Sequence, residues 1–444
     1  MLNQRNSISK GADPVPIILY LLLVIIGLVS IYSVEYKVND NFFSSIIGFK
    51  KNYSKQFIFF GVSCVVATLI MLTDSKFFTA TSNIFYLAGL LLMFATIFIG
   101  KSVGGSRSWI PLGFMNVQPV EVGKIFTALA LAKFISLPDT DFSKPRSHLI
   151  AAGLAFAPIL FSLLQNEPGL ALVYFSFLIP MYREGLPPIY LIIGASLAAL
   201  LVLSLLFSTK TLLILFTVLL VLALIFMQKR LKRDKSVLLV AVGIWGFAAA
   251  FSGLAVPFLF KNVFKKYQAD RIFSMLGKDN PYASSTTAEL GEKPKKADKE
   301  NYNVKQSKIA IGSGGFAGKG FLKGTQTQGD FVPEQHTDFI FTSVGESFGF
   351  IGCTVLMILY LGLLLKLVQM AERQRSVFSR VYIYSVTGIL FFHLAINICM
   401  TIGLAPVIGI TLPFLSYGGS SLLTFTILLF IAIKLDKDRQ MVLR

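Results

Sequence analysis

The residue whose type and position most directly suggest chemistry is Asp338, in the stretch PEQHTDFIF, where a polar segment runs into a long apolar one. A carboxylate there is expected at the boundary between membrane and water, where a membrane-anchored substrate presents its headgroup. Such a side chain can act as a general base toward a substrate hydroxyl. The alternative is an acidic residue that only complements the dipole of a helix N-terminus. The residue types alone leave both interpretations open.

Other ionisable residues fall within or beside apolar stretches, where charged side chains are costly and commonly functional. Glu121 and Lys124 are three residues apart and therefore share one face of a helix. This pair either holds a helix bundle together or binds a metal-bridged or phosphate-bearing ligand. Glu167 is expected at the end of a span and Glu346 two turns beyond Asp338, which makes them further buried-carboxylate candidates.

Glycines are concentrated at Gly312–Gly315 and Gly318–Gly320. They do not form a G-x-x-x-x-G-K-[ST] phosphate loop, although their backbone N–H groups could cradle an anion, with charge added by Lys308, Lys319 and Lys323. The stretch GLAPVIGITLPFLSYGGSS, residues 403–421, breaks helicity at membrane depth and predicts a re-entrant or cavity-lining segment. His393 is expected to be satisfied by a hydrogen bond within the bundle, and His336, two residues before Asp338, is left open.

The composition identifies the elements that must position these residues. Of 444 residues, 54% are hydrophobic and 14% are charged, whereas a soluble domain has about a quarter charged residues. This excludes a soluble enzyme, a disulfide-stabilised secreted scaffold, a disordered chain and a fibrous protein. The net charge of +18 fits loops beside anionic lipid headgroups rather than nucleic-acid binding. The three cysteines lie in apolar runs without metal-ligand spacing.

The fold class is therefore predicted to be an all-α polytopic membrane protein with about twelve spans of about 20 residues each. The first run is interpreted as an uncleaved helix because it is too long for a signal peptide. Pro180 marks one short run as a broken helix. The predicted spans are 15–34, 56–73, 83–100, 119–136, 148–165, 168–182, 187–208, 211–227, 236–257, 339–366, 378–402 and 419–435.

An even number of spans places both termini on one side, and lysine and arginine in the short loops identify that side as the cytoplasm. The basic residues that agree by parity are Lys144, Arg146, Lys229, Arg230, Lys232, Arg233, Lys235, Arg373, Arg375, Lys434, Lys437 and Arg439. Residues 258–338 then form a large loop outside, exempt from the charge rule by its length. Within it, residues 278–299 are predicted to be a mobile insert.

Several of these stretches, in this order, resemble the SEDS family (shape, elongation, division and sporulation). The likeness covers most of the chain, which is interpreted as a single integral-membrane domain over residues 1–444. The motifs are GSRSWIPLG from Gly105, QPVE at 118–121, QSKIAIGSGG, PEQHTDFIF and PFLSYGGSS. The run GKGFLKGTQTQ at 318–328 resembles the RodA branch more than the division branch.

The resemblance implies a peptidoglycan glycosyltransferase of the bacterial inner membrane. It would polymerise lipid II, the undecaprenyl-pyrophosphate-linked precursor, during cell elongation, with a class B penicillin-binding protein and other elongation-complex membrane proteins as partners. The family's essential aspartate maps onto Asp338, and its QPSE glutamate and following lysine map onto Glu121 and Lys124. Supporting positions are Glu167, His336, Glu346 and Ser416. Substrate contacts are expected at Arg107, Trp109, Lys319, Lys323 and Gln326.

The leaving group in this reaction is a lipid pyrophosphate, whose charge must be stabilised by a divalent cation, Mg or Mn, or by nearby Arg and Lys side chains. Asp338 or Glu121 could be a ligand of that cation, and no organic cofactor is expected.

The sequence departs from the family pattern at four places. QPVE stands for QPSE, a change that keeps the carboxylate of Glu121. QNEPG stands for QPDLG, so that Glu167 occupies the place of an aspartate. Residues 187–257 hold three spans where one is expected, and residues 278–299 are an insert. The alternative functions are a flippase or transporter of a lipid-linked precursor and a non-catalytic scaffold. An interfacial Asp338 favours the transferase, because transport sites tend to lie near the midplane.

Overall fold

The computed structural model describes residues 11–36, 51–103, 106–111, 113, 115–263, 269, 273 and 296–441. The chain divides into two compact units. The first comprises Met1–Leu186 and Val304–Arg444, and the second comprises Pro187–Asn303.

The predicted all-α membrane architecture is confirmed. Among the described residues, ten helices are long and apolar enough to cross a membrane. The other two predicted spans are also helical. Helix α5, Pro119–Ile135, has only 17 residues, and residues 168–183 are split by a 3-10 turn into α7, Pro168–Val173, and α8, Leu178–Arg183. The remaining long helices of the first unit are α1 Pro14–Glu35, α3 Asn52–Leu72, α4 Ser75–Ile99, α6 Pro145–Leu164, α17 Ile340–Glu372, α18 Val377–Thr401 and α19 Gly419–Lys437.

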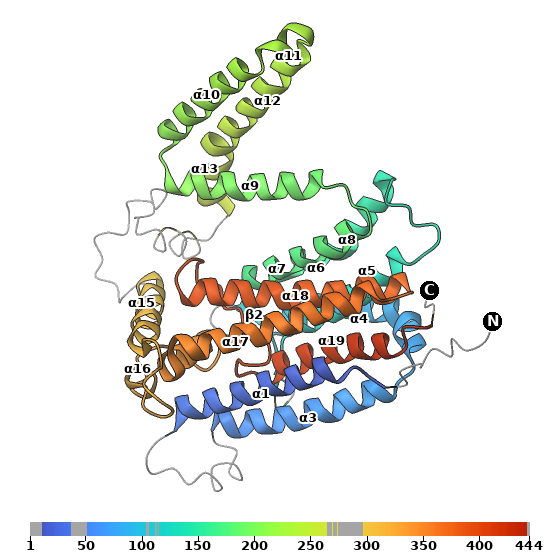
Figure 1. Cartoon of the computed structure of the whole chain (residues 1–444), viewed down its shortest axis with the longest axis vertical. Helices are drawn as coiled ribbons and strands as arrows, with labels where there is room; N and C mark the ends of the chain where they lie inside the picture. The colour runs from blue at the N-terminus through green and yellow to red at the C-terminus, as the bar shows by residue number, and fades with distance from the viewer. Residues whose placement is uncertain are drawn as a thin grey trace, which may run out of the picture. The chain divides into compact units, whose positions relative to one another are not determined.

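The centre of the first unit is formed by α18 and α19. Their apolar windows are 67% and 89% buried, whereas those of α3 and α4 are only 22% buried. Helices α1, α3, α17, α18 and α19 run side by side (Figure 1). The outward faces of the peripheral helices remain apolar, as a lipid environment requires. The central helices therefore carry the buried polar groups that position the site.

Both chain ends of the first unit lie at one end of this bundle, here called the Arg373 end. Arg373 forms ion pairs with Asp13, just before α1, and with Asp436 near the end of α19. Ser75, at the start of α4, donates a hydrogen bond to Asp438. This agrees with the expectation that both termini lie on one side, although residues 1–10 and 442–444 lie outside the described residues.

The opposite end, here called the Asp338 end, carries structure that the sequence did not predict. A small antiparallel sheet has the order β1-β2-β3, with β1 at Lys101–Val103, β2 at Ser106–Pro111 and β3 at Asn116–Val117. Helix α15, Lys296–Gly314, and the short α16, Thr325–Gln328, precede α17. Most of the predicted insert 278–299 lies outside the described residues, and its last four residues begin α15.

Helix α17 is interrupted at Gly349, whose φ of 62° favours glycine. The interruption frees backbone groups that the glycine-rich segment then satisfies. The N–H groups of Lys319 and Gly320 donate to the carbonyl oxygens of Glu346 and Ser347, and those of Phe350 and Ile351 donate to Gly315 and Phe316. The glycines at 312–320 thus serve a structural purpose, because they let one backbone approach another where a helix is broken.

The second unit contains three of the apolar helices, α9 Ile189–Leu206, α10 Thr209–Phe226 and α12 Ser236–Ala250. Helices α10 and α12 pack as a hairpin joined by α11, Gln228–Arg233 (Figure 1). Two π-helical turns and the short α13, Val256–Phe258, follow. Its small core contains Leu205, Val256, Phe260, Ala269 and Phe273. Three apolar helices therefore occupy the region where the family resemblance leads one to expect a single span.

Candidate functional site

The segment that ends in Asp338 is fixed from α18. Nδ2 of Asn397 donates to the backbone oxygen of Asp338 at 2.8 Å and to that of Ile410 at 2.7 Å. The carboxylate itself lies against Gly409, since a Cβ built there would be 3.5 Å from Oδ2 of Asp338. The buried amide of Asn397 thus ties the Asp338 backbone to the C-terminal loop. Among the described residues, the Asp338 side chain has no ion-pair partner.

The loop between α18 and α19, residues 402–418, is irregular and partly buried, as predicted. Oγ of Ser416 donates to the oxygen of Thr337 at 2.7 Å, and the N–H of Tyr417 donates to the oxygen of His336 at 2.8 Å. From α3, Gln56 donates to Ser416 O and accepts from Gly418 N–H. The Ser416 hydroxyl and the Tyr417 N–H of this loop therefore bind the backbone oxygens of residues 337 and 336, and this contact gives Ser416 a positioning role beside Asp338.

Glu167, between α6 and α7, is held by the small sheet. Ser106 and Ser108 alternate along β2 and so face the same side. Both hydroxyls donate to Oε1 of Glu167, at 2.6 and 2.7 Å. The N–H of Arg107, between them, donates to the backbone oxygen of Gln165. The hairpin therefore fixes both the Glu167 carboxylate and the chain that carries it.

The electrostatic environment of Asp338 is unusual for an aspartate. Burial, and then the negative charges of Glu334 and Glu167, raise the pKa of Asp338 to about 7, although its side chain keeps partial solvent exposure. An aspartate with this pKa can hold or release a proton near neutral pH. A partly accessible carboxylate of this kind is suited to general acid–base catalysis.

Glu346, in contrast, is completely buried and organises the segment 319–327. Its carboxylate accepts hydrogen bonds from Lys319 Nζ at 2.7 Å and from the N–H groups of Gln326 and Thr327 at 2.9 and 2.8 Å. The predicted substrate contact Lys319 thus already has a partner in the protein. Gln326 contributes its backbone N–H here, and its side-chain oxygen has no hydrogen-bond partner.

Glu121 and Lys124 form a buried network that reaches α18. Lys124 Nζ is 2.7 Å from Glu121 Oε2 and 2.7 Å from His393 Nε2, and it lies 5.1 Å from the centroid of the Phe425 ring. His393 Nδ1 is 3.0 Å from the carbonyl oxygen of Thr411. Because a carbonyl only accepts, Nδ1 carries the proton and Nε2 accepts from the ammonium. Of the two interpretations left open, this geometry favours structural support.

The remaining predicted substrate contacts lie at the Asp338 end but do not converge in the described structure. Arg107 is exposed on the face of β2 opposite Ser106 and Ser108, and Trp109 is partly exposed on the same strand. Lys323 is exposed between α15 and α16. His336 packs edge to face against Tyr417. Their roles toward a substrate stay predictions.

Sequence reasoning missed four residues that position the site, namely Gln56, Ser106, Ser108 and Asn397. The two serines had a signal, because they alternate directly after Gly-Gly, a pair typical of two-residue hairpin loops. Gln56 and Asn397 had none, since their partners are far away in the sequence.

The predicted divalent cation also stays a prediction. Within the described ranges, no three His, Cys, Asp or Glu side chains lie together as metal ligands. Glu121 is engaged by Lys124, and the charged groups of the described residues that act on Asp338 are the carboxylates of Glu334 and Glu167.

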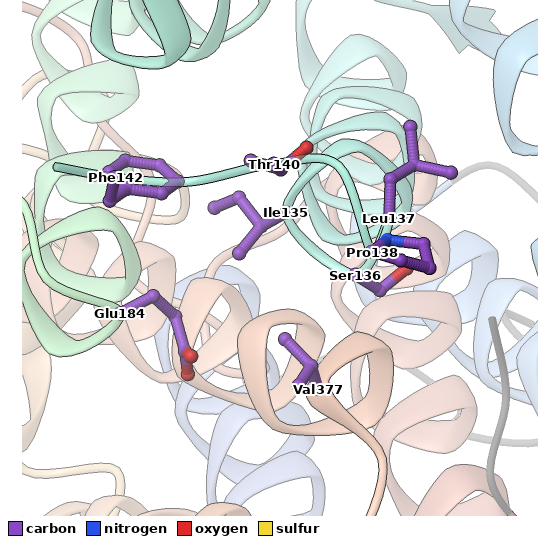
Figure 2. Close-up of a pocket in the computed structure, with 8 residues that line it drawn as sticks. All are labelled: Ile135, Ser136, Leu137, Pro138, Thr140, Phe142, Glu184 and Val377. Atoms are coloured by element: carbon purple, nitrogen blue, oxygen red, sulfur yellow. The ribbon is translucent and has the colours of Figure 1, made fainter. Parts of the chain in front are cut away.

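A pocket of about 380 Å³ lies at the Arg373 end, away from Asp338. Figure 2 shows residues of the α5–α6 connection on one side and Glu184 and Val377 on the other. Arg380 already forms a two-point ion pair with Glu184. The lining is Ile135, Ser136, Leu137, Pro138, Thr140, Phe142, Glu184 and Val377. None of the predicted site residues is among them.

Comparison with known proteins identifies the family of this chain. The model of the FtsW/RodA/SpoVE family, described as cell cycle protein, matches residues 14–212 and 206–441. The peptidoglycan glycosyltransferase MrdB of Escherichia coli strain K12 is 31% identical over 359 residues, covering 80% of this chain and 78% of that protein. The peptidoglycan glycosyltransferase RodA of Treponema pallidum is 29% identical over 434 residues, covering 91% and 92%.

Solved structures share the fold. The rod shape determining protein RodA of Thermus thermophilus has a TM-score of 0.61 at 21% identity, covering 97% of this chain and 98% of that one. A chain of a peptidoglycan synthase complex, described as coordinating polymerization and crosslinking, has a TM-score of 0.65 at 23% identity, covering 97% and 98%. The chain belongs to the FtsW/RodA/SpoVE family, the SEDS family that the motifs predicted.

Proposed function

We propose that this chain polymerises lipid II into glycan strands during cell elongation and that Asp338 is the general base of the reaction. The enzyme class, peptidoglycan glycosyltransferase, follows from the family and from the curated relatives. The role of Asp338 is argued from the geometry. The observation that carries it is a partly exposed carboxylate with a pKa of about 7, held by its own backbone at the end of the bundle.

In the proposed step, Asp338 accepts the proton of the acceptor sugar's 4-hydroxyl while that oxygen attacks the anomeric carbon of the donor. The bond between this carbon and the lipid pyrophosphate breaks, and the pyrophosphate leaves with the electron pair. A base with a pKa near the working pH combines a useful fraction of carboxylate with a useful driving force for proton transfer. The backbone bonds from Asn397, Ser416 and Tyr417 hold the segment still, which lowers the cost of aligning base and acceptor.

The membrane geometry supports the same assignment. Asp338 is two residues before α17 begins, which supports a position at the membrane boundary. The Arg373 end carries basic residues of the first unit that the charge rule assigns to the cytoplasm. This supports an outer position for Asp338, where we propose that the substrate's headgroup is polymerised. We therefore propose a multi-pass protein of the bacterial inner membrane with both termini cytoplasmic.

The leaving pyrophosphate needs positive charge, and the exposed cations at this end include Arg107, Lys308 and Lys323. Lys319, bound to Glu346, is better suited to shape its loop than to bind substrate. A bound Mg or Mn ion would supply further stabilisation of the developing charge. A class B penicillin-binding protein is the proposed partner, in line with the structural neighbour that belongs to a polymerising and crosslinking complex.

A transporter of the same lipid-linked precursor is the alternative. A transporter is expected to have a binding site for its substrate and coupling ion near the middle of the bundle, lined by charged groups that are free to bind them. The buried charges of α5 instead form a closed network, with Lys124 fully buried between Glu121 and His393. This arrangement offers no free ionic site, so the transferase is the better-supported function.

The test is polymerisation of purified lipid II in detergent by wild type and by Asp338→Asn, each with the cognate partner and Mg or Mn present. The substitution preserves size and removes the base. We expect glycan formation to fall by at least about 10²-fold, the contribution typical of a general base. Asp139→Asn, in the loop between α5 and α6, is the control and is expected to behave as wild type. Equal glycan yield from Asp338→Asn and wild type would refute the assignment.

A further inference from the structure

The contact between the sheet and Glu167 has an unexplained feature. The hydroxyl groups of Ser106 and Ser108 both donate to the same carboxylate oxygen of Glu167, Oε1, and the two hydroxyl oxygens are 3.0 Å apart. Within the described part of the chain, Oε2 forms no hydrogen bond. A carboxylate that only accepts hydrogen bonds is therefore anchored by one oxygen and free at the other.

The turn that carries this carboxylate packs beside the site. Gly169, two residues after Glu167, packs so closely on the carbonyl of Ile408 that a Cβ would overlap it. The next residue, Gly409, lies against the carboxylate of Asp338. The turn that carries Glu167 and the segment that carries Asp338 thus meet on the same two residues of the C-terminal loop.

The turn itself is rigid. Ser162 donates through its hydroxyl to Glu167 O at 2.6 Å, and Glu167 N–H donates to Ser162 O at 2.9 Å. Asn166 has a φ of 61° and makes the sharp change of direction. A charge held in this way cannot move away from Asp338 to reduce their repulsion.

We propose that Ser106 and Ser108 are positioning residues that fix the Glu167 carboxylate beside Asp338, and that the fixed charge of Glu167 sets the pH range in which Asp338 takes a proton from the acceptor. This deepens the proposed function and rests on Asp338 being the general base.

The charges that act on Asp338 come from two elements, Glu334 on its own segment and Glu167 on the α6–α7 turn. The groups that face it from α18 and from the C-terminal loop, Asn397 and Gly409, are uncharged. A carboxylate disfavours ionisation of its neighbour. Removing the charge of Glu167 therefore lowers the pKa of Asp338, and the acidic limb of the rate profile moves to lower pH.

The experiment is the pH dependence of lipid II polymerisation between about pH 5.5 and 8.5, measured with the partner present for wild type, Glu167→Gln and the double variant Ser106→Ala/Ser108→Ala. For wild type the limb is expected near the pKa of about 7. For Glu167→Gln it should move toward acid by up to about one pH unit, which raises the rate at pH 6, relative to the plateau, by up to about fivefold. The double serine variant should shift in the same direction by less.

Ser102→Ala, an exposed serine on the neighbouring strand β1, is the matched control and should leave the limb in place. The triple variant should shift no further than Glu167→Gln, because the serines act through that carboxylate. Uniformly lower rates with an unmoved limb would overturn the proposal. If Glu167→Gln does not fold, the double serine variant decides the question. If the limb does not move and Asp338→Asn is inactive, the role of Glu167 is refuted and the proposed function stands. If Asp338→Asn is active, the general-base assignment and the role of Glu167 are both refuted.

Discussion

Replacement of Lys124 by methionine tests how the polar network inside the bundle stabilises the fold. The Lys124 ammonium is fully buried and donates to Glu121 and to His393 at 2.7 Å each. Methionine is close in volume and flexible, so little cavity is created. The main effect is electrostatic, because the carboxylate of Glu121, only 3% exposed, loses its counter-charge.

The magnitude follows from the burial of the pair. Removing one partner of a buried ion pair costs about 3–5 kcal/mol, because the other charge remains in the interior without compensation. The lost contact of the ammonium with the Phe425 ring adds about 0.5–2 kcal/mol. Replacing both charged residues, as in Glu121→Gln/Lys124→Met, removes the stranded charge and should regain at least about 2 kcal/mol relative to Lys124→Met alone.

The assay is a double-mutant cycle of denaturant unfolding in detergent, with Lys76→Met, an exposed lysine in the first turn of α4, as the control. Lys76→Met should lie within about 0.5 kcal/mol of wild type. If Lys124→Met is as stable as wild type but inactive, the pair serves the reaction directly and the structural interpretation is refuted. If Lys124→Met and the double variant are equally destabilised, the two residues are not a coupled unit.

Three further predictions concern the ends of the bundle. Glu346→Gln should cost about 1.5–3 kcal/mol, the contribution of a charge-assisted hydrogen bond, and should make the segment 319–327 cleavable by limited proteolysis. Gly349→Ala should sharply reduce the yield of folded protein. A Cβ at a φ of 62° costs about 1–2 kcal/mol, and it would overlap the neighbouring backbone. Gly312→Ala is the control, because Gly312 has open space around it. Burial would raise the pKa of Asp13, but hydrogen bonds from Lys366 and Arg373 lower it below the ordinary value. The stabilisation is therefore present above the unfolded pKa of about 4 and lost as the pH falls further, and Asp13→Asn should flatten this loss in acid thermal unfolding.

The apolar spans could be predicted from the sequence because membrane helices satisfy their own backbone and need only a long apolar run. All twelve predicted spans fall on helices. The weakest of them, residues 168–182, was correctly suspected, and the structure splits it by a 3-10 turn. The sheet at 101–117 was missed because its strands are short and its hydrogen bonds form between segments rather than within one.

The candidate site was predictable only where its partners are close in the chain. Glu121 and Lys124 are separated by one helical turn, so their contact could be inferred, but His393 lies 269 residues from Lys124. Glu346 was recognised as a buried carboxylate, whereas its partner Lys319 lies 27 residues before it. Asp338 itself was identified from its place between a polar segment and an apolar helix.

What makes Asp338 distinct from the other carboxylates is the chemistry of its neighbours. Glu121 and Glu346 are each paired with a lysine, and Glu167 is bound by two serines. The Asp338 side chain receives no such partner among the described residues, and the negative charges beside it oppose its ionisation. Glu121, Glu167 and Glu346 are thus satisfied by partners, whereas the surroundings of Asp338 favour its protonated form. The neighbouring residues hold the backbone of this segment and not the Asp338 side chain. In the proposed reaction this leaves the carboxylate available to take the proton of the acceptor.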